Sequence, residues 1–189
     1  MTVLPYPLAD DGLPLRRVFL LPGSLYVATS PAVITTILGS CIAVCLWDWA
    51  RHISGMNHFV LPLSTEPGEQ SLRYGDVSID QLIKNMRDTG SRIKDLRAKL
   101  FGGASVLSFG SAQKTVGARN LDVALDRLHD YDIPVLAKRT GGRHGLLLRL
   151  NTLSGGVGLR PVSLGRMSDV PPRHSPDDRP RTSHRNLCA

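Results

Sequence analysis

A cysteine and a histidine in the first third of the chain have the residue types and spacing of a covalent catalytic pair. Cys41 follows Gly39-Ser40, and His58 lies seventeen residues further on, at the end of Gly55-Met56-Asn57-His58. The thiolate is the nucleophilic form of cysteine, and a nearby imidazole both lowers the thiol pKa and carries its proton. These residues make covalent cysteine chemistry the leading hypothesis.

A second cysteine competes for the same role. Cys41 and Cys45 fall on the same face of a strand, because side chains alternate between the two faces. Cys45 stands in the middle of an apolar run, where a free cysteine is commonly an inert packing residue. Cys41 stands at the edge of that run, behind two small residues that let a substrate approach the backbone. The amides of Ser40 and Cys41 at this turn could face a developing oxyanion.

The imidazole partner depends on strand register, which the sequence leaves open. An antiparallel hairpin turning near residues 49–52 would bring His58 beside or diagonal to Cys41–Cys45. The hydroxyl of Thr35 or Thr36, or a backbone carbonyl, could orient the ring.

Two glycine-rich runs, Phe101–Ala104 and Gly141–Gly145, match neither a P-loop nor a dinucleotide fingerprint. We interpret them as tight turns or as walls of a substrate groove. His144 in the second run, and His52 in the presumed hairpin turn, replace His58 as the base if the register slips.

Short apolar and β-branched segments predict a protein rich in strands. The predicted strands include Val18–Leu21, Leu25–Thr29, Val33–Thr36, Cys41–Trp47, Met56–Leu63, Leu146–Leu150 and Val157–Val162. With about eight to ten strands and two helices, strict βαβ alternation is excluded. We predict an α+β sandwich of mixed or antiparallel sheets with the two main helices on one face.

The helices are indicated by apolar residues that recur at helical spacing. The first includes Ile79, Leu82, Ile83 and Met86, and the second includes Leu121, Ala124, Leu125 and Leu128. Asp76 or Ser78 is the expected cap of the first helix, Ser78 forming a capping box with Gln81, and Gly90 closes it. Asn120 is the expected cap of the second helix.

Length and composition predict one folded domain, residues 16–167, between two arms. Residues 1–15 hold three prolines and read as a loose arm. Residues 168–189 are almost free of apolar side chains, so we predict a disordered tail. In that tail, His174 and His184 are expected to be solvated and not to bind metal, and Cys188 is expected to be a free exposed thiol without function.

Cysteine and charge usage limit the class of protein. The three cysteines form neither a disulfide framework nor a zinc motif, so we expect reduced thiols, a cytoplasmic protein and no metal. No apolar run is long enough to span a bilayer, and no signal peptide is visible. The net charge of +7 suggests nucleic-acid binding, with a solvated basic surface or an acidic protein partner as the alternatives. The densest basic segment holds Arg92, Lys94, Arg97 and Lys99. Without a nucleic-acid-binding signature, we expect no nucleic acid partner.

Taken together, the motifs resemble those of the CheD family of chemoreceptor glutamine deamidases, from about Val18 to about Val162. Seven blocks occur in the family's order. They are Thr35-x-x-x-Gly39-Ser40-Cys41-x-Ala43-Val44-Cys45-Leu46, Gly55-Met56-Asn57-His58-Phe59-Val60-Leu61-Pro62, Arg73-Tyr74-Gly75-Asp76, Ala98-Lys99-Leu100-Phe101-Gly102-Gly103-Ala104, Gly117-Ala118-Arg119-Asn120, Ile133-Pro134-Val135 and Gly141-Gly142-Arg143-His144-Gly145.

The resemblance implies a role for each site residue. Cys41 is the nucleophile, His58 the general base and acid, and Thr35 the third residue, which orients the imidazole. The implied candidates for the oxyanion site or the substrate groove are Gly39, Ser40, Asn57, Gly102 and Gly103. The implied fold is similar to that of deamidating bacterial toxins with a papain-type Cys–His arrangement.

The implied substrates are glutamines on the cytoplasmic helices of chemoreceptors, which are often acidic, and the implied reaction needs no cofactor. In some organisms the family also binds CheC, a phosphatase. Glutamyl methyl esters are a second substrate class to consider, because an alkoxide is no worse a leaving group than an amide nitrogen. We expect a monomer. The alternative is a non-catalytic receptor- or CheC-binding regulator, against which Thr35, Cys41 and His58 argue.

Overall fold

The computed structural model describes residues 15–66, 68–105 and 115–162. These residues form nine strands, two α-helices and one short 3-10 turn. Apart from Leu15, the predictions for residues 1–15 and 168–189 lie outside the described residues.

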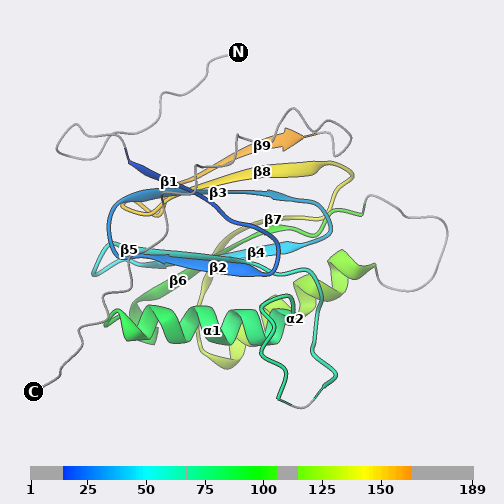
Figure 1. The fold of residues 1–189 in the computed structure, drawn as a ribbon, viewed down its shortest axis with the longest axis horizontal. Helices are drawn as coiled ribbons and strands as arrows, with labels where there is room; N and C mark the ends of the chain where they lie inside the picture. Colours follow the sequence, from blue (N-terminus) through cyan, green and yellow to red (C-terminus); the bar gives the residue numbers. More distant parts are fainter. Residues whose placement is uncertain (1–14, 67, 106–114, 163–189) are drawn as a thin grey trace, which may run out of the picture.

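The nine strands form two packed sheets (Figure 1). The first sheet has the order β1 (Arg16–Phe19), β3 (Ala32–Leu38), β8 (Gly145–Asn151) and β9 (Val157–Val162). The second has the order β2 (Ser24–Ala28), β5 (Ile53–His58), β4 (Ile42–Asp48), β6 (Leu96–Gly102) and β7 (Val135–Thr140). Both are mixed, because β1 pairs with β3 and β6 with β7 in parallel and the other pairs are antiparallel.

Two helices, α1 (Gly75–Asp88) and α2 (Val116–Asp130), cover the outer face of the second sheet (Figure 1). The short turn η1 (Ile93–Asp95) leads from α1 into β6. The predicted α+β sandwich with both helices on one face is confirmed. No helix formed by the described part of the chain is long and apolar enough to cross a membrane.

The middle strand β4 separates two hydrophobic cores. Ile42, Val44 and Leu46 pack beneath the helices, whereas Ala43 and Cys45 pack between the two sheets. This alternation follows from the period of two along a strand and explains why the run from Cys41 to Trp47 is apolar without interruption.

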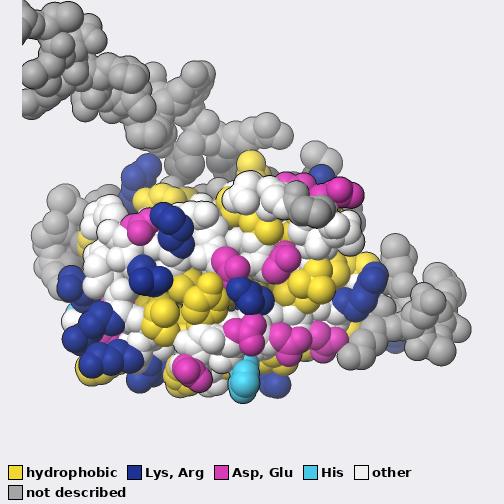
Figure 2. Space-filling view, turned by 90° about the horizontal axis from the view of Figure 1, so that it is seen from below, with side chains coloured by type: hydrophobic (Ala, Val, Ile, Leu, Met, Phe, Trp, Pro, Cys, Tyr) yellow, Lys and Arg dark blue, Asp and Glu magenta, His cyan; other side chains and the backbone are white. Residues whose placement is uncertain are grey.

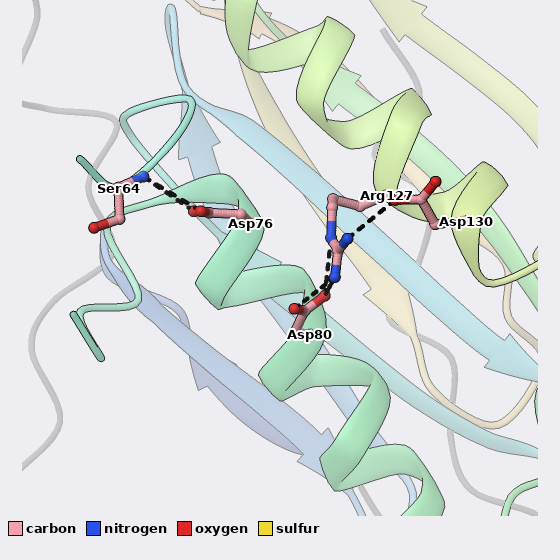
Figure 3. Close-up of polar contacts among 5 residues, drawn as sticks. All are labelled: Ser64, Asp76, Asp80, Arg127 and Asp130. Carbon is pink, nitrogen blue, oxygen red and sulfur yellow. Dashed lines mark hydrogen bonds and ion pairs between the residues drawn. The ribbon is translucent and has the colours of Figure 1, made fainter. Parts of the chain in front are cut away.

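The predicted cap of α1 is wrong. Tyr74 stands at the N-cap without a side-chain hydrogen bond, and the helix begins at Gly75. The carboxylate of Asp76 accepts instead from the N–H of Ser64, at 3.3 Å (Figure 3). Ser78 is buried and faces the core, so its hydroxyl is not available to form a capping box. At the other end, Gly90 with φ +93° follows the helix and donates its N–H to Arg87, as predicted.

The predicted cap of α2 is also wrong. Thr115 caps this helix by accepting from the N–H of Ala118 at 3.2 Å, and Asn120 lies inside the first turns, fully buried. The two helices are joined by a bidentate pair in which Arg127 Nη2 lies 2.6 Å from both carboxylate oxygens of Asp80 (Figure 3).

Candidate active site

The β4–β5 hairpin places the thiol and the imidazole on one face. Ile42 and Phe59 exchange both backbone hydrogen bonds, at 3.2 and 3.0 Å, and the same register pairs Cys45 with Met56. His58 therefore lies diagonal to Cys41, and alternation turns both toward the other sheet. The predicted turn near residues 49–52 is confirmed, and the register places His58 diagonal to Cys41, one of the two arrangements that the sequence predicted.

The hydroxyl that holds the imidazole belongs to Thr36 and not to Thr35. Thr36 Oγ1 lies 2.8 Å from His58 Nδ1, and both residues are buried between the sheets. Thr35 is the next residue along β3, so its side chain points to the opposite face of that sheet. The hydrogen bond to the imidazole that the resemblance implies for Thr35 is thus made by Thr36.

The pattern of β3 contains a signal that could have found Thr36. Ile34 and Leu38 are apolar residues of the inter-sheet core, and Thr36 stands midway between them on the same face. A threonine whose side chain faces the core needs a hydrogen-bond partner inside the protein. This favours Thr36 over Thr35 as the hydrogen-bond partner of a buried imidazole.

The hydrogen bonds of Thr36 fix the tautomer of His58. The Thr36 hydroxyl donates its single hydrogen to the carbonyl of Leu20 at 2.8 Å, because a carbonyl can only accept. Nδ1 of His58 must therefore carry the proton and donate to Thr36. Nε2 is left unprotonated, and it has no hydrogen-bond partner among the described residues. The free lone pair is the one a general base requires.

Burial favours the neutral forms of both Cys41 and His58. It lowers the pKa of His58 to about 4, against the effect of the Leu20 carbonyl. It also raises the pKa of Cys41 from 9.0, while the backbone N–H of Cys41 acts in the opposite direction. At pH 7 the pair is therefore a thiol and a neutral imidazole. The expected lowering of the thiol pKa by the imidazole is wrong for this state, because burial disfavours both charged forms.

The competing candidates lie elsewhere. Cys45 is buried in the inter-sheet core, and burial raises its pKa to about 12. His52 stands in the β4–β5 turn, at the opposite end of β4 from Cys41, with its ring near Trp47. His144 is exposed in the β7–β8 turn and forms no hydrogen bond to Cys41 or His58. The imidazole that shares a face with Cys41 is that of His58.

The segment at residues 39–41, the candidate nucleophile loop, is held in place by the glycine motif at the end of β6. Gly103 donates its N–H to the carbonyl of Cys41, and Ala104 donates to the carbonyl of Gly39, both at 2.8 Å. A Cβ on Gly102 would overlap the carbonyl oxygen of Cys41. Both glycines are buried and have positive φ angles, so they carry the loop and do not line an open groove.

Of the other groove candidates, Gly39 and Ser40 lie at the surface and Asn57 does not. Ser40 is exposed and Gly39 half-buried, directly before the half-buried Cys41. Asn57 is fully buried and faces the helix layer, since it alternates with Met56 and His58. Its Oδ1 accepts from the N–H of Val44 at 2.8 Å, in place of a backbone partner. Asn57 therefore shapes the strand pairing and cannot reach the inter-sheet face.

Sequence reasoning also missed the part that Asn120 plays in this site. Its Nδ2 donates to the carbonyls of Ser40, at 3.2 Å, and Val60, at 2.9 Å. The residue type by itself suggests only a helix cap. The signal that could have pointed to the site is its place in Gly117-Ala118-Arg119-Asn120, one of the seven blocks that carry the family resemblance. Gly117 lets the helix start approach Gly103, because a Cβ there would lie 2.5 Å from the Gly103 carbonyl oxygen.

Fold and site together define a β-sandwich protein that gathers a thiol, an imidazole and a hydroxyl at one end, between its two sheets. The chain belongs to the CheD family, since the family model described as CheD chemotactic sensory transduction matches residues 60–161.

Similar curated proteins carry one name, "Probable chemoreceptor glutamine deamidase CheD". The protein of this name from Rhodospirillum rubrum is 54% identical over 144 residues, covering 76% of this chain and 81% of its own. That from Trichlorobacter lovleyi is 43% identical, covering 78% and 92%, and that from Sulfurimonas denitrificans is 43% identical, covering 73% and 89%. Among solved structures, the Bacillus licheniformis hypothetical protein YfiH superposes with a TM-score of 0.43 at 14% identity, covering 63% of this chain and 51% of that one.

Proposed function

We propose that this protein deamidates glutamine side chains on the cytoplasmic helices of chemoreceptors, with Cys41 as the nucleophile and His58 as the base and acid. The observation that carries the proposal is the hydrogen-bond chain from Leu20 through Thr36 to His58, which leaves Nε2 unprotonated on the face it shares with Cys41. The names of the curated relatives support the same reaction.

The first half of the reaction forms a thioester. Nε2 of His58 takes the proton of the Cys41 thiol as the sulfur attacks the carboxamide carbon. The resulting oxyanion lies near the amides of the nucleophile loop. When the tetrahedral intermediate collapses, His58 returns its proton to the nitrogen, and ammonia leaves.

The second half regenerates the enzyme. Neutral His58 takes a proton from water, and the hydroxide attacks the thioester carbon. The carbon–sulfur bond then breaks, giving glutamate and a Cys41 thiol that takes the proton back from His58. A glutamyl methyl ester would follow the same path with methanol as the leaving group, so we propose methylesterase activity as a side reaction.

The proposal includes a cytoplasmic monomer with one deamidase domain at residues 16–167 that uses no cofactor. A CheC-type phosphatase is a further proposed partner, on the ground of the family resemblance. The neutral imidazole favours an enzyme over a purely binding regulator. A docking surface has no need of a buried histidine whose Nε2 has no hydrogen-bond partner among the described residues.

Mass spectrometry of a purified chemoreceptor cytoplasmic fragment tests the reaction, through the mass gain that converts glutamine to glutamate. We expect Cys41→Ala to abolish the gain while the protein stays folded. Cys45→Ala is the matched control: Cys45 lies four residues further along, in β4 and facing the same inter-sheet core, so this variant should lower stability but keep turnover. Deamidation by the Cys41→Ala protein, or its loss only in Cys45→Ala, would refute the assignment.

A further inference from the structure

Asn120 is a polar residue on an otherwise apolar helix face. It is fully buried, and its neighbours on that face of α2 are Val123, Ala124 and Leu128. Its Nδ2 makes two hydrogen bonds, whereas its Oδ1 has none among the described residues. A buried amide that is only half satisfied costs stability. Helix packing therefore does not explain why an asparagine stands at this position. The explanation must come from its hydrogen bonds to the carbonyls of Ser40 and Val60.

The backbone of the nucleophile loop is held by its carbonyls. Those of Gly39 and Cys41 accept from the backbone amides of Ala104 and Gly103, and that of Ser40 accepts from Asn120. In a trans peptide the C=O of one residue and the N–H of the next point in opposite directions. Fixing the Ser40 carbonyl toward α2 thus turns the Cys41 N–H away from α2.

The Cys41 N–H has the properties of an oxyanion donor. It forms no hydrogen bond to another described residue, and it approaches the thiol of its own side chain, where it favours the thiolate. A negative oxygen formed by attack of that sulfur would develop beside the same N–H.

We propose that Asn120 is the positioning residue of this oxyanion site: through the Ser40 carbonyl it aims the Cys41 N–H at the oxygen of the tetrahedral intermediate. Its bond to the Val60 carbonyl ties the same loop to the segment that follows His58, so one side chain sets the nucleophile relative to the base. The inference rests on the proposed function of Cys41. Among the described residues, Asn120 supplies the side-chain hydrogen bond to the carbonyls of this loop, and Gly103 and Ala104 supply the backbone ones. A substitution of Asn120 can therefore remove its hydrogen bond without altering the backbone donors.

The test compares Asn120→Ala with Leu128→Ala, a buried apolar position about two turns further along the same helix, in the core beneath the helices. For Asn120→Ala we expect kcat for deamidation of a chemoreceptor fragment to fall about 10- to 100-fold with KM nearly unchanged, somewhat less than the loss of an oxyanion donor itself. Leu128→Ala should lower Tm and leave kcat unchanged at temperatures where it is folded. Asn120→Ser places its hydroxyl one bond closer to the helix than Asn120 Nδ2, too short to reach the Ser40 and Val60 carbonyls. It should lose kcat as Asn120→Ala does, and it serves if that variant does not fold.

A measurement made without substrate separates the positioning role of Asn120 from the proposed function of Cys41. Misaligning the Cys41 N–H should move the pH midpoint of Cys41 alkylation upward and shift the amide NMR signal of Cys41, in Asn120→Ala but not in Leu128→Ala. A folded Asn120→Ala protein, or Asn120→Ser in its place, with wild-type kcat and an unchanged alkylation profile would overturn the positioning role. Activity retained in Cys41→Ala would instead refute the proposed function.

Discussion

Thr35 and Thr36 are adjacent in β3 and point to opposite faces of its sheet, so single substitutions can separate their roles. Thr36→Val keeps the side-chain shape but removes the hydroxyl that accepts from His58 Nδ1. We expect kcat to fall at least about tenfold, toward the loss of about 10²–10⁴ that accompanies removal of general acid–base catalysis. Thr35→Val should stay near wild type. Steady-state deamidation kinetics of both variants test this prediction. A larger loss of kcat in Thr35→Val than in Thr36→Val would restore Thr35 as the residue that orients the imidazole.

The resting protonation of Cys41 can also be measured at the residue level. Because burial raises the pKa of this thiol, its thiolate fraction, and hence its alkylation by iodoacetamide, should rise with pH through a midpoint above 9. A Cys188→Ser background keeps the last thiol of the sequence out of the signal.

His58→Gln serves as the control for this measurement. A neutral imidazole lends no charge to the thiolate, so this variant should leave the midpoint nearly unchanged. Alkylation that already reaches its plateau near pH 6–7, and that requires His58, would instead indicate a thiolate–imidazolium pair.

At the level of elements, the site depends on the end of β6 lying directly behind the start of β4. Gly102 has φ +108°, and a Cβ there would overlap the Cys41 carbonyl oxygen. Gly102→Ala should therefore displace the nucleophile loop, with a large loss of turnover and a loss of stability above about 1–3 kcal/mol, the cost of an unfavourable backbone angle alone.

Gly141→Ala is the matched control for Gly102→Ala. It has a comparable φ of +79°, but no atom lies within 4 Å of the added Cβ. This variant should lose the stability that an unfavourable backbone angle costs, and it should keep most of its turnover. Thermal unfolding and deamidation kinetics of both proteins provide the comparison, and equal turnover in the two would contradict the support that we assign to Gly102.

At the level of the whole molecule, charge is distributed unevenly. α1 and α2 carry six aspartates between them, and acidic side chains line the middle of the helix face, with Lys and Arg gathered toward one end (Figure 2). The basic segment around η1 does not form one docking face. Arg92 pairs with Asp95, and Lys99 turns inward to the carbonyl of Gly155. This segment also adjoins Asp48, at the opposite end of β4 from Cys41.

Other basic side chains stand near the site. Lys138 and Arg139 are exposed on β7, whose last residue, Thr140, pairs with Gly102. If an acidic receptor helix approaches Cys41, these charges should raise its encounter rate. We expect the double variant Lys138→Glu/Arg139→Glu to lower kcat/KM several-fold and to weaken its dependence on salt.

The control for these charges is a double variant with the same change in net charge, Arg87→Glu/Lys94→Glu. Both residues are exposed near the end of α1 and η1, away from Cys41. Its kcat/KM should stay within about twofold of wild type at physiological ionic strength, where screening limits charges more than about 8 Å away. Equal losses in the two double variants would show that only the net charge matters.

The sequence alone determined the layers of this protein and the cysteine and histidine that are the leading candidates for its site. Period-two and helical patterns report which side chains are buried, so they predicted the sandwich, both helices and the two-faced strand β4. The β4–β5 hairpin is local, so residue types and spacing predicted that His58 lies beside or diagonal to Cys41–Cys45. The register itself, which excludes His52 and His144, came from the structure.

Only the tertiary structure decided what surrounds that pair. Thr36 reaches His58 from the other sheet, and Asn120 reaches Ser40 from a helix eighty residues away along the chain. Such contacts depend on how sheets and helices pack, which no local pattern specifies. The protonation of the pair was decided in the same way, since the pKa values of Cys41 and His58 follow from burial, and burial is a property of the packed molecule.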